Sequence, residues 1–321
     1  MIFKPIIIIS GEPNSVFLEI FLKTFLKNKF KSPLILICSK KILDYHMKKL
    51  NIFADVNLIN YKKIVIEKLS KNKINLIDVE YEYKYKFEKI SEKTNGYITK
   101  CINIALFLFK IKISNKIING PIAKKPFLKR KHLGITEYLA KRVHVNKLAM
   151  LIYNKKLAVC PITTHLPIKL VHKNISQEDI INKIKLIDNF YSTYLNTPAK
   201  IGITGLNPHN ESILPLNEDE FIIKPLVKKL KKLKININGP LPADTIFMKQ
   251  NREKFNVIVG MYHDQVLTPI KTLFEYDAIN ITLGLPFIRV SPDHGPNEKM
   301  LGKNLSSPLS LIRAIEFLDK N

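Results

Sequence analysis

Cysteine, signal-like segments and long hydrophobic runs are all scarce in this chain of 321 residues. Its three cysteines have no close spacing, which argues against a disulfide scaffold or a zinc ribbon. The longest apolar runs, Pro5–Ile9 and Ile104–Phe109, fall far short of the ~20 residues that a membrane helix needs. Residues Met1–Pro5 lack the basic region and long apolar stretch of a signal peptide. We therefore expect a cytoplasmic globular protein without a membrane partner.

Acidic residues and arginine are also few. The chain has 52 Lys+Arg against 27 Asp+Glu, a net charge of +25, but only five of the basic residues are arginine. Base readout and bidentate phosphate contacts favour arginine, and the lysines are spread along the chain in short pairs. We interpret the excess as solvated surface and expect no nucleic-acid partner. A positive field would also attract an anionic small substrate.

Several common catalytic motifs are absent. The chain contains no GxGxxG, GxxxxGK[ST], GxSxG or CxxC string. This excludes the usual phosphate cradles and nucleophile elbows. A nicotinamide cofactor, if one is used, must be held without the Rossmann fingerprint.

Short apolar runs alternate with amphipathic stretches of helix length, which predicts an α/β protein with largely parallel sheets. Strands are expected at Pro5–Ser10, Leu34–Cys38, Lys156–Pro161, Lys200–Thr204, Asn256–Met261 and Ile279–Thr282. Helices are expected at Val16–Lys27, Ile98–Lys110, Ser176–Leu195, Ile222–Lys232 and Pro308–Lys320. The polar, aromatic segment Ile74–Lys89 suggests an edge strand or a surface hairpin.

Three of the eight histidines follow expected strands by a few residues: His165, His209 and His263. They should lie at the carboxyl edge of the sheet, where open α/β folds bind ligands. Three converging neutral imidazoles make a divalent metal site with room for a substrate oxygen. A single histidine at such a place is more often an ordinary loop or cap residue. Taken together, with Asp264 next to His263 as a possible partner of its ring, the three leave both interpretations open. His46, on a lysine-rich amphipathic stretch, is expected at the surface.

Five strings, in this order, resemble the 4-hydroxythreonine-4-phosphate dehydrogenase (PdxA) family: ITTHLP (Ile162–Pro167), GLNPHNE (Gly205–Glu211), GPLPADTIF (Gly239–Phe247), MYHDQVLTPIK (Met261–Lys271) and SPDHG (Ser291–Gly295). The resemblance runs from about Gly11 to Gly302. It implies an isocitrate/isopropylmalate dehydrogenase-like fold, with two α/β domains and a cleft between them, and a homodimer. We expect a discontinuous first domain, 1–125 plus 255–321, and a second domain, 126–254.

The resemblance also implies a divalent metal site, shared across the dimer interface, whose ligands are His165, His209 and His263. It implies contacts to a small phosphorylated substrate from Thr136, Lys271, Asn280 and Arg289. The turn with His294 and Gly295 is expected either to bind the dinucleotide or to be structural. Asp244 is a candidate proton acceptor, with a turn carboxylate as the alternative.

The implied reaction is the oxidation and decarboxylation of 4-phosphooxy-L-threonine to 3-amino-2-oxopropyl phosphate, in pyridoxal phosphate (vitamin B6) biosynthesis. The cofactor would be NAD or NADP, and the metal zinc, cobalt or magnesium, with the soft histidine ligands favouring the first two. The chain departs from the family at Ile135, where a histidine is usual, and in the loops Asn14–Phe17 and Pro296–Lys299. Two alternatives therefore remain: a paralogous metal-dependent dehydrogenase of another hydroxy acid, or a lysine-rich binding protein that has lost catalysis.

Overall fold

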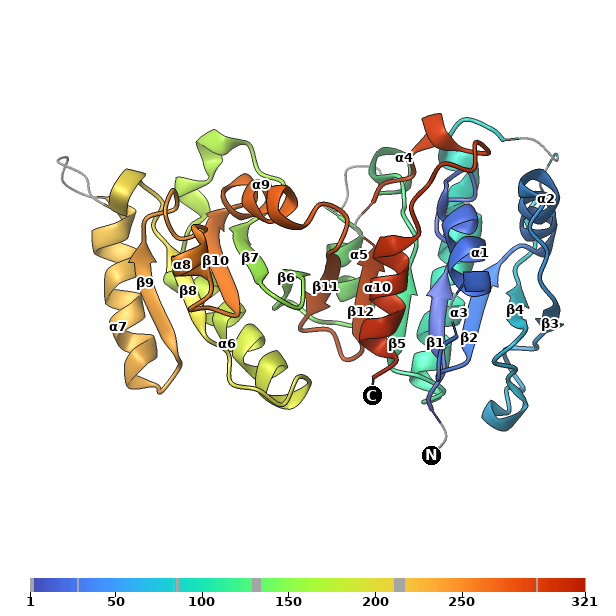
Figure 1. Cartoon of the computed structure of the whole chain (residues 1–321), viewed down its shortest axis with the longest axis horizontal. Helices are drawn as coiled ribbons and strands as arrows, with labels where there is room; N and C mark the ends of the chain where they lie inside the picture. Colours follow the sequence, from blue (N-terminus) through green and yellow to red (C-terminus); the bar gives the residue numbers. More distant parts are fainter. Residues whose placement is uncertain are drawn as a thin grey trace. The chain divides into compact units, whose positions relative to one another are not determined.

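The computed structural model describes residues 3–27, 29–82, 84, 87–128, 134–210, 217–292 and 294–320 (Figure 1). The chain forms two compact units, one of Met1–Leu139 with Pro286–Asn321 and one of Ala140–Leu285. This division differs from the expected 1–125 plus 255–321 and 126–254, because residues 255–285 belong to the second unit. There, β10 (Val257–Tyr262) is paired with two strands of that unit.

The first unit is built on a parallel sheet in the order β3-β4-β2-β1-β5-β12. Its strands are β1 (Ile6–Ile9), β2 (Leu34–Cys38), β3 (Val56–Leu58), β4 (Ile74–Asp78), β5 (Lys116–Asn119) and β12 (Ile288–Pro292). Its helices are α1 (Phe17–Lys27), α2 (Lys40–Leu50), α3 (Asn95–Lys110), α4 (Lys124–Leu128), α10 (Leu309–Leu318) and the start of α5 (Ile135–Arg142). Figure 1 shows α1 and α10 in front of the strands and α3 behind them. The four isoleucines of β1 are all buried, as is typical of a strand covered on both faces.

The second unit has a mixed sheet in the order β11-β6-β7-β10-β8-β9. Its strands are β6 (Ala149–Tyr153), β7 (Ala158–Thr163), β8 (Ile201–Thr204), β9 (Ile237–Leu241), β10 and β11 (Ile279–Leu283). The β11–β6 and β6–β7 pairs are antiparallel, and the others are parallel. Its helices are α6 (Gln177–Thr193), α7 (Lys224–Lys232), α8 (Lys249–Arg252) and α9 (His263–Phe274). In the described part of the chain, none of the helices has the length and apolarity to cross a membrane.

The expected strands and helices are all confirmed within a few residues. The expectation for Ile74–Lys89 was wrong in one respect, because Ile74–Asp78 is an interior strand between β3 and β2. Its Asn75 is fully buried, and the side-chain amide donates to the carbonyl oxygens of Leu34 and Ser70 at 3.0 and 2.7 Å. A buried amide with satisfied hydrogen bonds therefore gives this strand its polar character. Part of the following aromatic segment, including Tyr83 and Tyr85, lies outside the described residues.

His46 is buried, contrary to the surface position expected from the lysines around it. Its side chain on α2 is 1% exposed, and its ring lies 5.2 Å from that of Phe87, between centroids. Neither ring nitrogen has a hydrogen-bond partner among the described residues. Burial lowers the pKa of His46 from 6.5 to about 4, so the folded protein holds this imidazole neutral.

We expect His46 to make the protein sensitive to acid. Because its pKa is lower in the folded state, its full contribution to stability is present above about pH 6.5 and is lost as the pH falls toward 4. The loss amounts to about 3 kcal/mol in the free energy of unfolding. Urea unfolding of the wild type and of His46→Phe at pH 7.5 and 4.5 measures it. The variant should lose less stability over this interval, and equal losses would contradict the prediction.

Candidate functional site

The three expected metal ligands lie after three neighbouring strands of the second unit. His165 comes shortly after β7, His263 begins α9 directly after β10, and His209 lies in a short turn after β8. Because β10 pairs in parallel with both β7 and β8, the carboxyl ends of these strands share one edge of the sheet. The backbones of His165 and His209 have positive φ angles of 42° and 56°. Such angles are uncommon outside glycine and concentrate at functional sites.

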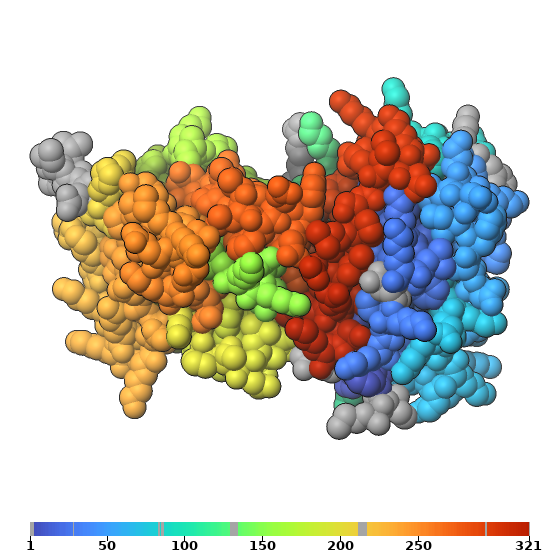
Figure 2. Space-filling model, in the orientation of Figure 1, coloured from blue at the N-terminus to red at the C-terminus, as the bar shows by residue number. Residues whose placement is uncertain are grey.

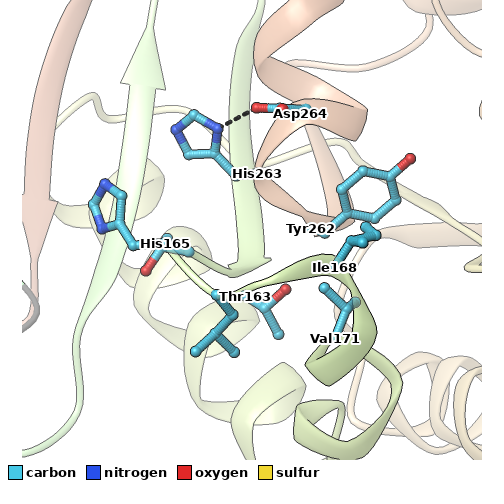
Figure 3. A pocket seen from close by; sticks show the side chains of 9 residues that line it. Thr163, His165, Ile168, Val171, Tyr262, His263 and Asp264 are labelled. Atoms are coloured by element: carbon cyan, nitrogen blue, oxygen red, sulfur yellow. Dashed lines mark hydrogen bonds and ion pairs between the residues drawn. The ribbon is translucent and has the colours of Figure 1, made fainter.

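The side chains form two separate pairs. His165 and His263 line a cavity of about 290 Å³, with their ring centroids 5.7 Å apart (Figure 3). His209 instead lies beside Asp244, with 3.6 Å between Nδ1 and the carboxylate oxygen Oδ2. Over the described ranges of the chain, no three histidine, cysteine or carboxylate side chains are grouped closely enough to hold a metal. Within one chain, His209 therefore does not join the other two.

Asp264 orients the ring of His263. The carboxylate oxygen Oδ1 lies 2.6 Å from His263 Nδ1 (Figure 3). With the Nδ1 hydrogen donated to this carboxylate, Nε2 carries the free lone pair that a metal would take. Asp264 directly follows His263 in the sequence, and the structure places the two side chains in contact.

A buried arginine forms a second centre in the first unit. Arg289, on β12, is 2% exposed, and its Nε donates to Asn119 Oδ1 at 2.6 Å. Its Nη1 donates to Thr136 Oγ1 at 2.9 Å. Burial lowers the pKa of Arg289 to about 10, although the nearby Glu137 carboxylate raises it, so the guanidinium stays charged at neutral pH. The structure thus brings together two expected substrate contacts, Thr136 and Arg289.

Asn119 is a member of this centre that the sequence analysis missed. It ends β5 and is almost completely buried, and its side-chain amide also donates to the carbonyl oxygen of Gly120 at 3.0 Å. The available signal was an amide residue directly after two buried isoleucines, Ile117 and Ile118, and just before a glycine. Such a residue at the carboxyl end of a parallel strand has the same position as the three histidines.

The other two expected substrate contacts, Lys271 and Asn280, belong to the second unit. Lys271 is on α9 and half-buried, and burial lowers the pKa of its ammonium group. Asn280 is on β11, and its Oδ1 is buried without a hydrogen-bond partner among the described residues. An unpartnered buried acceptor favours a ligand that donates a hydrogen bond.

His294 and Gly295 follow β12 in the first unit. The ring of His294 is stacked on that of Phe17, with 6.3 Å between centroids, and its Nδ1 donates to the carbonyl oxygen of Gly295 at 2.9 Å. Burial lowers the pKa of His294, which keeps the ring neutral. Its Nε2 is buried and has no partner in the part of the chain that the structure describes. A Cβ on Gly295 would meet open space, so a ligand can approach the backbone there.

Comparison with known proteins identifies the family. Residues 29–318 match the family model described as "Pyridoxal phosphate biosynthetic protein PdxA". The chain belongs to the PdxA family. A PdxA relative from Sulfurihydrogenibium sp., named 4-hydroxythreonine-4-phosphate dehydrogenase, is 37% identical over 95% of this chain and 94% of its own length. A relative from Pectobacterium atrosepticum, named D-threonate 4-phosphate dehydrogenase, is 28% identical and covers 98% of each chain.

Solved structures confirm the predicted fold class. The chain is similar to a putative 4-hydroxythreonine-4-phosphate dehydrogenase from Salmonella typhimurium, with a TM-score of 0.85, 26% identity and 98% of each chain covered. A β-decarboxylating dehydrogenase from Thermococcus kodakarensis has a TM-score of 0.52 at 11% identity, covering 98% of this chain and 82% of that one. The second likeness concerns the fold alone. It shows that the two chains share the same overall fold.

Membership of this family of dehydrogenases implies a nicotinamide cofactor and a metal. The side chains at the two places described above fit the metal and the cofactor. Two imidazoles facing one cavity, one of them oriented by a carboxylate, suit a divalent transition metal. The unpartnered Nε2 of His294 and the open backbone at Gly295 suit a ligand rich in hydroxyl groups.

We expect Asp264→Asn to weaken metal binding without unfolding the PdxA chain. The amide cannot accept the Nδ1 hydrogen through its nitrogen and carries no charge, so the orientation and basicity of His263 both suffer. The metal dissociation constant should rise about 10- to 100-fold. Titration with Co²⁺, followed by its visible absorption, measures this. An unchanged cobalt affinity would show that Asp264 plays no part.

Proposed function

We propose that the chain is a 4-hydroxythreonine-4-phosphate dehydrogenase in pyridoxal phosphate biosynthesis. It would oxidise and decarboxylate 4-phosphooxy-L-threonine to 3-amino-2-oxopropyl phosphate, with NAD as the hydride acceptor. The observation that carries the proposal is the facing pair His165 and His263 at the strand-end cavity. It occurs in a chain that shares almost its full length with a relative of that name.

The metal site would need two copies of the chain. Since His209 lies apart from His165 and His263 within one chain, we propose a homodimer in which His209 completes the partner's site. Zinc or cobalt suits three imidazoles better than magnesium. A divalent ion bound there would acidify the substrate hydroxyl and stabilise the negative charge left by decarboxylation.

The remaining side chains would bind and orient the substrate. Arg289 offers a planar fork of donors, aligned by its hydrogen bond to Thr136 Oγ1, for an anionic group of the substrate. Lys271 supplies a second cation, and the buried Oδ1 of Asn280 can accept a hydrogen from the substrate amine. Asp244, 3.6 Å from His209, would accept the proton of the hydroxyl.

The dinucleotide would bind at His294 and Gly295. The neutral ring of His294 has Nδ1 occupied by a carbonyl and Nε2 free to accept a hydrogen bond from a ribose hydroxyl. NADP is the alternative to NAD. The cytoplasmic location stays a prediction.

A second candidate substrate is D-threonate 4-phosphate, in which a hydroxyl group replaces the amine. The observation that favours it is Ile135, which begins α5 directly beside Thr136 and puts an apolar side chain where the family usually has an imidazole. The relative of that name also aligns over nearly the whole chain.

The deciding experiment is NADH formation by purified, metal-supplemented protein with NAD and 4-phosphooxy-L-threonine. Turnover that a chelator stops would support the proposal. D-threonate 4-phosphate serves as the second substrate, and preference for it would support the alternative. A folded, metal-loaded dimer that forms no NADH with either substrate would overturn both. Salt-sensitive nucleic-acid binding in that case would favour a binding protein that has lost catalysis.

A further inference from the structure

The segment 294–306 is attached to α1 of the same unit at both of its ends. At its start, the amide of Val16 donates to the carbonyl oxygen of Pro296 at 3.1 Å, and Phe17 stacks on His294. In Figure 2, the red C-terminal residues of the first unit lie directly beside the blue residues of α1. The two loops in which the chain departs from its family, Asn14–Phe17 and Pro296–Lys299, therefore contact each other.

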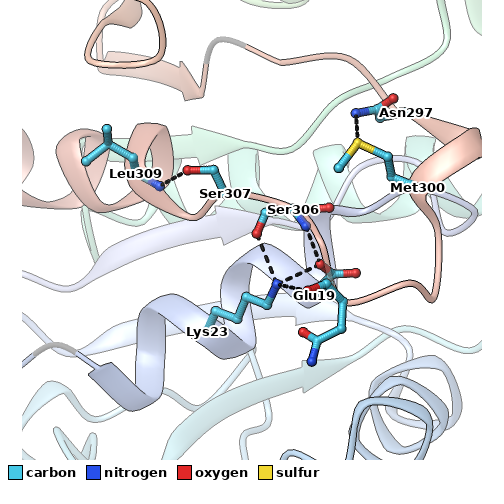
Figure 4. A network of polar contacts seen from close by, with 8 residues as sticks. Glu19, Lys23, Asn297, Met300, Ser306, Ser307 and Leu309 are labelled. Atoms are coloured by element: carbon cyan, nitrogen blue, oxygen red, sulfur yellow. Dashed lines mark hydrogen bonds and ion pairs between the residues drawn. The ribbon is translucent and has the colours of Figure 1, made fainter.

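Glu19 and Lys23 hold the other end of the segment (Figure 4). The Glu19 side chain is completely buried, and its Oε1 accepts hydrogen bonds from Lys23 Nζ at 2.9 Å and from the Ser306 amide at 2.8 Å. Lys23 Nζ donates in addition to the carbonyl oxygens of Asn304 and Ser306, at 2.9 and 3.0 Å. The Glu19–Lys23 ion pair thus makes hydrogen bonds to three backbone groups of a segment that is distant from it in the sequence.

The middle of the segment also has a defined path. Gly302 has a positive φ of 75°, and a Cβ there would come within 2.5 Å of the ring of Phe87. Only glycine combines this backbone conformation with so close an approach. The segment is therefore held at its start, at Gly302 and at Ser306.

We propose that Glu19 and Lys23 are positioning residues for the dinucleotide. By fixing the Ser306 end of the segment on α1, they hold His294 and Gly295 at its start in the geometry that receives the cofactor. The inference rests on the proposed function, because it takes the cofactor to bind at those two residues. Burying a charge pair is a poor way to gain stability, whereas a lysine that donates to two carbonyl oxygens specifies one path for the backbone.

The test compares three variants. Glu19→Gln/Lys23→Met removes both charges and so leaves no buried charge unpaired. Lys23→Arg keeps the charge and the donors. Lys27→Met removes an exposed lysine one turn further along α1 and is the matched control. Each protein is titrated with NADH, followed by its fluorescence and without the phosphorylated substrate, and hydrogen exchange of residues 301–307 is measured on the free protein.

The double variant should bind NADH at least tenfold more weakly, or about 1.4 kcal/mol in binding free energy, because His294 and Gly295 no longer hold the position that receives the cofactor. The Ser306 amide should exchange faster, while the KM for the phosphorylated substrate should stay within about twofold. Lys23→Arg should recover most of the affinity, and Lys27→Met should match the wild type. Unchanged NADH affinity in the folded double variant would overturn the proposal, and so would an equal rise in both constants, which indicates general destabilisation.

The inference and the proposed function can fail separately. If the wild type binds NADH but turns over neither phosphorylated substrate, the proposed reaction is wrong, while the ratio of NADH affinities still tests Glu19 and Lys23. If the wild type binds no NADH, the positioning role is overturned together with the cofactor assignment.

Discussion

Replacing His263 with alanine is expected to abolish metal retention and to lower turnover by more than about 100-fold. Loss of a side chain that only orients a metal-binding histidine typically weakens metal affinity about 10- to 100-fold, and His263 itself would supply a metal-binding nitrogen. The ring faces His165 across the strand-end cavity. The measurements are metal content after dialysis and initial rates of NADH formation.

His172→Ala is the matched control for this prediction. His172 is in the same unit, a few residues after His165, and is exposed. Its loss should leave metal content and rate unchanged. Equal metal content in His263→Ala and wild type would show that His263 is not a ligand. His209→Ala should also lose the metal. If the substitution lowers the metal content of the dimer but not that of the monomer, the result supports a site shared between two chains.

Arg289→Lys is expected to raise the KM for the phosphorylated substrate about 10- to 100-fold, because a charged hydrogen bond is worth about 1.5–3 kcal/mol. Lysine keeps the charge but not the fork that reaches Asn119 and Thr136 together. The free energy of unfolding should also fall by about 1–3 kcal/mol, since buried polar groups are left without partners. Steady-state kinetics and urea unfolding measure the two effects.

Arg313→Lys provides the comparison. Arg313 lies on α10 of the same unit and pairs with Glu316 at 2.9 Å, with about a third of each side chain exposed. Surface ion pairs contribute about 0–1 kcal/mol, so this change should affect neither the KM nor the stability strongly. If Arg289→Lys binds substrate as tightly as Arg313→Lys, Arg289 has only a structural role.

Much of the fold could be predicted because its elements depend on local patterns. The isoleucines of β1 and the apolar run of β2 are continuous, as strands buried on both faces must be. The start of α6 was equally readable, since Ser176 Oγ accepts the amide hydrogen of Asp179 at 3.1 Å. These features involve residues that are neighbours along the chain.

The errors have non-local causes. His46 carries lysines on both sides along α2, but the ring that covers it belongs to Phe87, from a distant segment. The residues 255–285 belong to the second unit because β10 inserts between β7 and β8, and strand order is not encoded in any local pattern. Asn75 is polar in a buried strand because Leu34, on another strand, offers a carbonyl oxygen.

By itself, the sequence determined the family, the α/β class and the kinds of side chain available for chemistry, because these depend on residue type and local spacing. Only the tertiary structure decided which side chains meet. It paired His165 with His263 and His209 with Asp244, enclosed Arg289 between Asn119 and Thr136, and joined Glu19 to Ser306. The physical reason is that side-chain chemistry is a property of each residue, whereas distances between remote residues depend on how the strands are ordered and paired.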